Sequence, residues 1–216
     1  MQALRVVPKI FYFDTFKEFN EEFKLGKGDI LVTNEWMYTP YVAPLGIDIP
    51  VIYQEKYGMG EPTDEMMDAM KVDMDKYEYD RIIAFGGGTI VDICKVLACE
   101  IPDKAADLYT GKVEAKRIKD LVLVPTTCGT GSEVTNVAVA SIPSMNLKKG
   151  IATEETYADA AVLIPESLAG LPDKVFATSS VDALIHAVES FLSPKASPFT
   201  DLFGAKAIEM IMNGYA

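Results

Sequence analysis

Three consecutive glycines, Gly86, Gly87 and Gly88, form the turn whose residue types most directly suggest chemistry. They follow a short apolar run at residues 82–85, which is typical of a buried parallel strand. Glycine lets a backbone approach a ligand closely, and a helix starting at such a turn presents free amides and the positive end of its dipole. The turn predicts an anion site suited to phosphate. Close packing between the strand and the helix would explain the three glycines equally well. It lacks the G-x-G-x-x-G fingerprint of a standard dinucleotide site.

Thr89 and Asp92 have the Thr-x-x-Asp spacing of a capping box. This spacing predicts that the Thr89 hydroxyl caps the helix that follows the glycines. It also predicts that the Asp92 carboxylate turns back toward the Thr89 amide, and so away from a bound phosphate.

A second polar loop follows another apolar run, residues 121–125, and reads Thr-Thr-Cys-Gly-Thr-Gly-Ser-Glu at 126–133. In open α/β sheets, ligands bind at the carboxyl ends of the strands, and hydroxyls with glycine amides suit ribose oxygens and a carboxamide. The loop therefore predicts a second part of one ligand site. The alternative is a polar turn that is rich in threonine because threonine caps well.

Asp182 and His186 are four residues apart in a long helical pattern that begins at residue 173. Side chains at this spacing share one helix face, as a carboxylate and an imidazole must if they bind one metal ion. A hydrogen bond along the helix explains the pair equally well. His186 is the single histidine, and two protein ligands do not complete a transition-metal site.

The elements that must position these residues alternate between strand and helix up to residue 164. Strand-like runs lie at 9–13, 29–33, 50–53, 82–85, 121–125 and 160–164. Helical patterns separate several of them. We expect one helix capped by Asp14 and closed by Gly26, a second at 36–45, and a third that Thr63 opens and that runs through Met74. A hairpin is expected from 134–140 and 149–152. This alternation predicts an α/β fold with a parallel sheet. After a Gly-Leu-Pro turn at 170–172 the pattern is helical, so we expect an α/β domain at 1–165 and an all-helical domain at 166–216.

The composition excludes some partners. The 216 residues carry 20 basic and 32 acidic side chains, a net charge of −12, without a basic cluster. Such a surface repels nucleic acid and anionic membranes. The N-terminus lacks an apolar signal region. The three cysteines have no C-x-x-C spacing, which suits reduced thiols. A cytoplasmic protein that binds neither nucleic acid nor membrane is expected.

Three motifs, in this order, are highly specific when taken together. They are Gly-Gly-Gly-Thr-x-x-Asp-x-x-Lys at 86–95, Pro-Thr-Thr-Cys-Gly-Thr-Gly-Ser-Glu-Val-Thr at 125–135 and Asp-Ala-Leu-Ile-His-Ala-x-Glu at 182–189. The chain thereby resembles the front part of the iron-containing alcohol dehydrogenases. The resemblance implies an NAD(P)-binding α/β domain and a helical domain holding Fe²⁺, sometimes Zn²⁺. It also implies a homo-oligomer and hydride transfer between NAD and a primary alcohol/aldehyde pair. Finer matches at 27–29, 33–35 and 54–58 imply that the alcohol and the aldehyde of this pair are 4-hydroxybutyrate and succinic semialdehyde.

The resemblance also implies roles for individual residues. It makes Asp182 and His186 the first two metal ligands, with no catalytic residue beyond the metal ligands. The cofactor residues that it implies are Gly86, Gly87, Gly88, Thr89 and Asp92 at the pyrophosphate, Thr126, Thr127, Thr130 and Ser132 along the nicotinamide half, Lys149 at a ribose, and Asn34 at the end of the strand 29–33.

Two departures from the family pattern qualify these roles. The family's other two metal ligands are histidines further along the helical domain, and none follows His186. We therefore expect either a chain truncated within that domain or a loss of metal binding. Asn34 stands where many relatives carry an aspartate that repels the 2′-phosphate of NADP. The asparagine weakens that exclusion, although the closer resemblance favours NAD.

Three other functions remain open from the sequence. A dehydroquinate synthase-like lyase would share the architecture. A catalytically incomplete module would bind a dinucleotide without turnover. Cys128 as a nucleophile would need a base, and the chain has no second histidine to serve as one.

Overall fold

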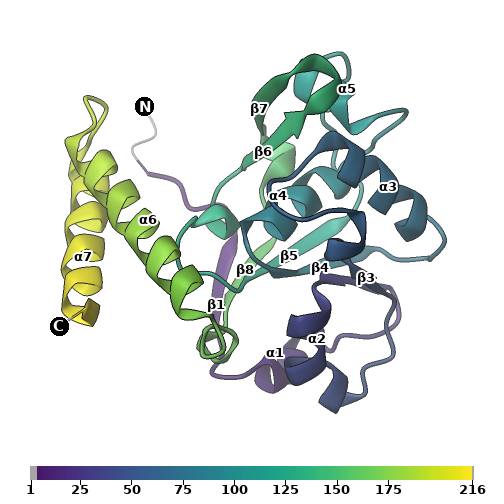
Figure 1. Cartoon of the computed structure of the whole chain (residues 1–216), viewed down its shortest axis with the longest axis horizontal. Helices are drawn as coiled ribbons and strands as arrows, with labels where there is room; N and C mark the ends of the chain where they lie inside the picture. The colour runs from purple at the N-terminus through teal and green to yellow at the C-terminus, as the bar shows by residue number, and fades with distance from the viewer. Residues whose placement is uncertain (1–3, 216) are drawn as a thin grey trace. The chain divides into compact units, whose positions relative to one another are not determined.

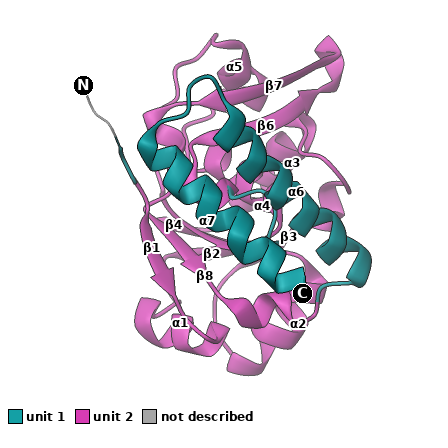
Figure 2. Ribbon diagram, turned by 90° about the vertical axis from the view of Figure 1, so that its left-hand side faces the viewer, with its two compact units in different colours: residues 1–6, 127–131, 171–216 teal, residues 7–126, 132–170 magenta. Residues whose placement is uncertain are grey.

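The computed structural model describes residues 4–215 and contains two compact units. The larger unit comprises residues 7–126 and 132–170. The smaller unit comprises residues 127–131 and 171–216, together with the segment before residue 7 (Figure 2).

A six-stranded sheet forms the centre of the larger unit (Figure 1). Its strand order is β1-β8-β5-β4-β2-β3. All five pairings within it are parallel. This confirms the expected α/β fold with a parallel sheet. The strands are β1 Lys9–Tyr12, β2 Asp29–Thr33, β3 Val51–Tyr53, β4 Arg81–Gly86, β5 Asp120–Pro125 and β8 Ala160–Leu163.

An antiparallel hairpin, β6 Val137–Ile142 and β7 Leu147–Ala152, forms a separate two-stranded sheet. It confirms the predicted hairpin, although its first strand begins at Val137 instead of Val134. Asn146 lies in its turn with a φ of 47°, in the left-handed region that asparagine tolerates.

Helices cover both faces of the six-stranded sheet, as the strands, apolar on both sides, require. The helices α3 Asp64–Met74, α4 Gly88–Leu97 and α5 Ala105–Thr110 share one buried cluster with Ile30, Ile82 and Leu121. The helices α1 Phe16–Phe23 and α2 Glu35–Tyr41 share another with Ile83 and Val122. Six 3₁₀ turns complete this unit: Ala43–Leu45, Gln54–Tyr57, Ser132–Val134, Pro143–Met145, Glu154–Thr156 and Pro165–Leu168.

Some helix ends differ from the sequence predictions. Thr15, and not Asp14, caps α1, because its Oγ1 accepts a hydrogen bond from the Glu18 amide at 3.2 Å. The helix ends at Lys24, which adopts the left-handed conformation expected of a glycine such as Gly26. The helix expected through Leu45 ends at Tyr41 and continues only as a 3₁₀ turn. The predicted start of α3 at Thr63 is confirmed.

The smaller unit consists mainly of α6 Asp173–Leu192 and α7 Pro198–Tyr215, which run side by side (Figure 2). Gly204 lets them approach closely, since a Cβ there would lie 3.3 Å from the Ala187 carbonyl oxygen. The Tyr215 hydroxyl donates to Ser180 Oγ at 2.6 Å. By length and mean hydropathy alone, α6 meets the criteria for a membrane span, and 6% of its most apolar window is buried.

Candidate functional site

The carboxyl ends of four parallel strands meet at one edge of the sheet. Gly86 of β4 is in register with Pro125 of β5, and Thr33 of β2 is in register with Tyr53 of β3. The glycine turn therefore starts between the end of β5 on one side and the ends of β2 and β3 on the other. This edge is where ligands bind in open α/β sheets.

The glycine turn leads directly into α4. Gly87 is the N-cap residue and supplies no side-chain hydrogen bond to the helix. Within the described chain, none of the three glycines has a positive φ. Gly86 is required by packing, because a Cβ there would lie 2.4 Å from Ile90 Cδ1. The packing interpretation and the ligand interpretation are therefore compatible. Gly86 allows α4 to pack against β4, and the first turn of α4, which no side chain caps, has backbone amides that can donate to a ligand.

The predicted capping box is wrong. The helix begins at Gly88, so Thr89 is already its second residue. The Thr89 hydroxyl donates to the Gly60 carbonyl oxygen at 2.8 Å. The Asp92 carboxylate accepts from Ser132 Oγ at 2.5 Å and from the Val139 amide at 3.0 Å. Asp92 thus anchors the second loop and the hairpin onto α4, and both its oxygens are used within the protein.

A buried lysine, which the sequence reasoning missed, completes this network. Lys95 has 0% exposure, and its Nζ donates to Ser132 Oγ and to the Val137 carbonyl oxygen, each at 2.6 Å. Nζ lies 3.5 Å from Asp92 Oδ1. Burial lowers the pKa of Lys95 to about 8, although the nearby Asp92 carboxylate acts to raise this pKa. The available signal was the i, i+3 spacing of Asp92 and Lys95 within the motif at 86–95.

The remaining cofactor candidates of the larger unit have different surroundings. Thr126 is buried, and its amide donates to the Gly86 carbonyl oxygen at 3.0 Å, which joins the starts of the two loops. Asn34 is 7% exposed, and its Nδ2 donates to Glu55 Oε2 at 2.8 Å. Lys149 is exposed on β7, opposite Ala140.

The other candidates belong to the smaller unit. Thr127 and Thr130 lie in the segment 127–131, which groups with α6 and α7. Its Cys128 Sγ lies 3.3 Å from Ser179 Oγ. A hydroxyl is not a base at neutral pH, so this contact gives no support to Cys128 as a nucleophile.

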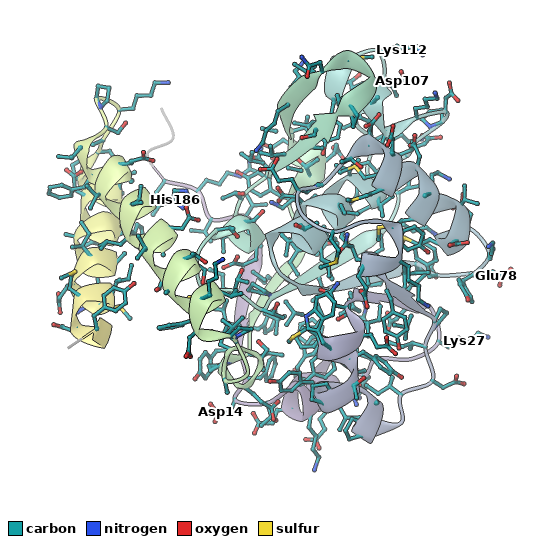
Figure 3. The ribbon with its side chains drawn as sticks, viewed as in Figure 1. Asp14, Lys27, Glu78, Asp107, Lys112 and His186 are labelled. Atoms are coloured by element: carbon teal, nitrogen blue, oxygen red, sulfur yellow. The ribbon has the colours of Figure 1, made fainter. Side chains whose placement is uncertain are left out.

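Asp182 and His186 lie four positions apart on α6, and Figure 3 labels His186 on this helix. His186 Nε2 is 3.7 Å from Asp182 Oδ1, and the two side chains are 52% and 47% exposed. Asp182 also lines a cavity of about 430 Å³ with Val181 and Ile185. A carboxylate and an imidazole are suitable donors for Fe²⁺ or Zn²⁺. Residues 4–215 contain no group of three or more such donors, so the described chain supplies a pair of ligands and not a complete set.

Comparison with known proteins places the chain in a family. Residues 8–165 match the model of the iron-containing alcohol dehydrogenases, and residues 176–216 match that of the C-terminal region of the Fe-containing alcohol dehydrogenase family. The 4-hydroxybutyrate dehydrogenase of Clostridium kluyveri is 51% identical over 215 residues, which are 100% of this chain and 58% of that protein. The sulfoacetaldehyde reductase of Bilophila wadsworthia is 38% identical over 134 residues, 61% of this chain and 35% of that protein.

A solved structure shows the same fold. The sulfoacetaldehyde reductase of Bifidobacterium kashiwanohense, in complex with NAD⁺, superimposes with a TM-score of 0.85 at 24% identity. The match covers 98% of this chain and 58% of that one. The chain thus spans 58% of the length of the Clostridium kluyveri protein and of this solved structure. With family matches on both parts of the chain and an extensive 51% identity, the chain belongs to the iron-containing alcohol dehydrogenase family.

Proposed function

We propose that this chain binds NAD(H) along the carboxyl edge of its parallel sheet, as the cofactor-binding part of an iron-dependent dehydrogenase. The observation that carries the proposal is the uncapped first turn of α4 behind Gly86–Gly88, in a member of this family. Free amides and the helix dipole favour a pyrophosphate at that turn. Asp92 stabilises the site from within the protein, because its oxygens already accept two hydrogen bonds.

The substrate pair that we assign is 4-hydroxybutyrate and succinic semialdehyde. The support is the 51% identity to a 4-hydroxybutyrate dehydrogenase over the whole chain. In the oxidative direction the alcohol carbon loses a hydride to NAD⁺ and its hydroxyl loses a proton, which yields the aldehyde and NADH. We place this reaction in the cytoplasm.

The polar loop and the helix pair have distinct roles in this proposal. Thr126, Thr127 and Thr130 orient the nicotinamide half, and Lys149 binds a ribose. Ser132 holds its loop in place, since its hydroxyl is bonded to Lys95 and Asp92.

Asp182 and His186 contribute two ligands to a divalent metal. Iron, or zinc in its place, supplies polarisation of the substrate oxygen when it is bound.

NADH fluorescence titration tests the cofactor site. We expect saturable binding by the wild-type chain and binding at least about tenfold weaker in Gly87→Asp, because a carboxylate there repels the pyrophosphate. The φ of −72° at Gly87 is open to any residue, so the backbone tolerates this change. Gly214→Asp on α7 is the control, since a Cβ there meets open space. Equal binding by wild type and Gly87→Asp would contradict the site.

A second candidate function is dinucleotide binding without turnover. The observation that favours it is the incomplete ligand set at Asp182 and His186 in the described residues. NADH oxidation at 340 nm with succinic semialdehyde and added Fe²⁺ separates the two functions. Turnover supports the dehydrogenase, and NADH binding without turnover supports the module.

A further inference from the structure

An acidic cavity lies at the ends of β2 and β3, on the side of the glycine turn away from β5. It measures about 560 Å³ and is open to solvent. Its volume lies in the range typical of small-molecule sites. The lining residues are Glu35, Trp36, Thr39, Pro40 and Glu55.

The Glu55 carboxylate in this cavity is held in a fixed position. Its Oε2 accepts from Asn34 Nδ2 at 2.8 Å, and its Oε1 accepts from the Glu35 amide at 2.8 Å. Within the described residues no cation pairs with Glu55. Lys56, the next residue, has its Nζ 4.8 Å from the centroid of the Tyr53 ring. The end of β3 therefore presents an immobilised negative charge to the cavity.

This arrangement explains why residue 34 is an asparagine. The Asn34 amide donates to Glu55, whereas an aspartate at this position would place a second carboxylate within hydrogen-bonding distance of the first. Two carboxylates at that separation repel each other, and one of them is driven toward protonation. Asn34 therefore does not leave the edge without an acid. In this chain the carboxylate at this edge lies just after β3, and the residue that follows β2 is the amide that binds it.

We propose that Glu55 selects NAD(H) over NADP(H), with Asn34 as its positioning residue. The inference rests on the proposed cofactor site. A dinucleotide with its pyrophosphate at α4 and its nicotinamide toward the β5 loop extends its adenosine half over β2 and β3. A carboxylate there accepts hydrogen bonds from ribose hydroxyls, as the acidic residue of other dinucleotide folds does, and it repels a 2′-phosphate.

The test is a titration of NADH and of NADPH against the wild-type chain, Glu55→Gln and Glu35→Gln. We expect Glu55→Gln to shift the ratio of the two Kd values about tenfold toward NADPH, because it removes one charge beside a phosphate. Glu35→Gln is the matched control: it removes an exposed charge of the same cavity. We expect its shift to be clearly smaller, since its side chain is more fully solvated. Asn34→Ala should shift the ratio in the same direction as Glu55→Gln, and add nothing in the Glu55→Gln background.

Three results would overturn the inference in distinguishable ways. An unchanged ratio of the Kd values for NADH and NADPH in Glu55→Gln, with NADH binding retained, would show that Glu55 does not select the cofactor. The proposed cofactor site would stand. A shift of the Kd ratio in Glu35→Gln as large as that in Glu55→Gln would show that the general negative charge of the cavity, and not the fixed Glu55 carboxylate, sets the preference. Binding of neither nucleotide by a wild-type chain with a folded circular dichroism spectrum removes the cofactor site and this inference with it.

Discussion

Lys95 gives a prediction whose sign and size follow from the structure. Its amine is buried and its folded pKa is about 8, lowered by that burial. In the unfolded chain the same amine titrates near its ordinary value of about 10.4. Between these two values the unfolded chain binds more protons at this position than the folded chain does. The free energy of unfolding attributable to Lys95 therefore rises with pH across that window.

The perturbation is Lys95→Met, which keeps much of the side chain's length and removes its charge. From pH 7 to pH 10, linkage between the two pKa values predicts that the stability of wild type relative to the variant grows by about 2 kcal/mol. Buried Cys99 has its pKa raised to about 11 and opposes this trend, but it is common to both proteins. Comparing the two proteins therefore isolates Lys95.

Urea unfolding at pH 7, 8, 9 and 10 measures this difference. The single tryptophan, Trp36, lies in the larger unit and reports its unfolding by fluorescence. Lys17→Met is the matched control, because Lys17 has a side chain 70% exposed in the same unit. Its difference from wild type should change less with pH than that of Lys95→Met, because its side chain is solvated in the folded chain. A flat or falling difference for Lys95→Met would refute the argument that burial lowers the pKa of Lys95.

Three further predictions test the local structure. Gly86→Ala should destabilise the chain by about 1–3 kcal/mol, because its Cβ would overlap Ile90, whereas Gly214→Ala should not; equal midpoints in urea would contradict this. Thr63→Ala should cost about 1 kcal/mol through loss of the α3 cap, and an unchanged thermal midpoint would show that the cap contributes nothing. His186→Ala should weaken Co²⁺ binding in an absorbance titration; unaltered binding would remove His186 from the metal site.

The sequence predicted the architecture because the signals for it are local. Apolar runs of strand length recur between helical patterns, and an alternation of this kind leaves a parallel sheet as the natural arrangement. The cap at Thr63 depends only on a hydroxyl three residues before the amide it bonds, and it was predicted correctly. At the first helix two neighbouring residues, Asp14 and Thr15, could both cap. Only the backbone path into α1 decides between them.

The details of the site depend on contacts between distant segments, which spacing does not reveal. Asp92 bonds Ser132 and Val139, 40 and 47 positions away, and these contacts replace the local capping box that the sequence favoured. Glu55 bonds Asn34 across 21 positions. From the sequence alone, Asn34 stands where many relatives carry an aspartate. The fold shows that the carboxylate of Glu55 lies beside Asn34.

The most direct test of the central claim is a titration of ¹⁵N-labelled chain with NAD⁺, followed by NMR. With the pyrophosphate at the first turn of α4, the amides of Gly87, Gly88 and Thr89 should show the largest chemical-shift changes, with smaller changes in the loop 126–133. Saturable shifts at these amides would support the cofactor site. NAD⁺-dependent shifts elsewhere with these amides unmoved, or none at all, would contradict it.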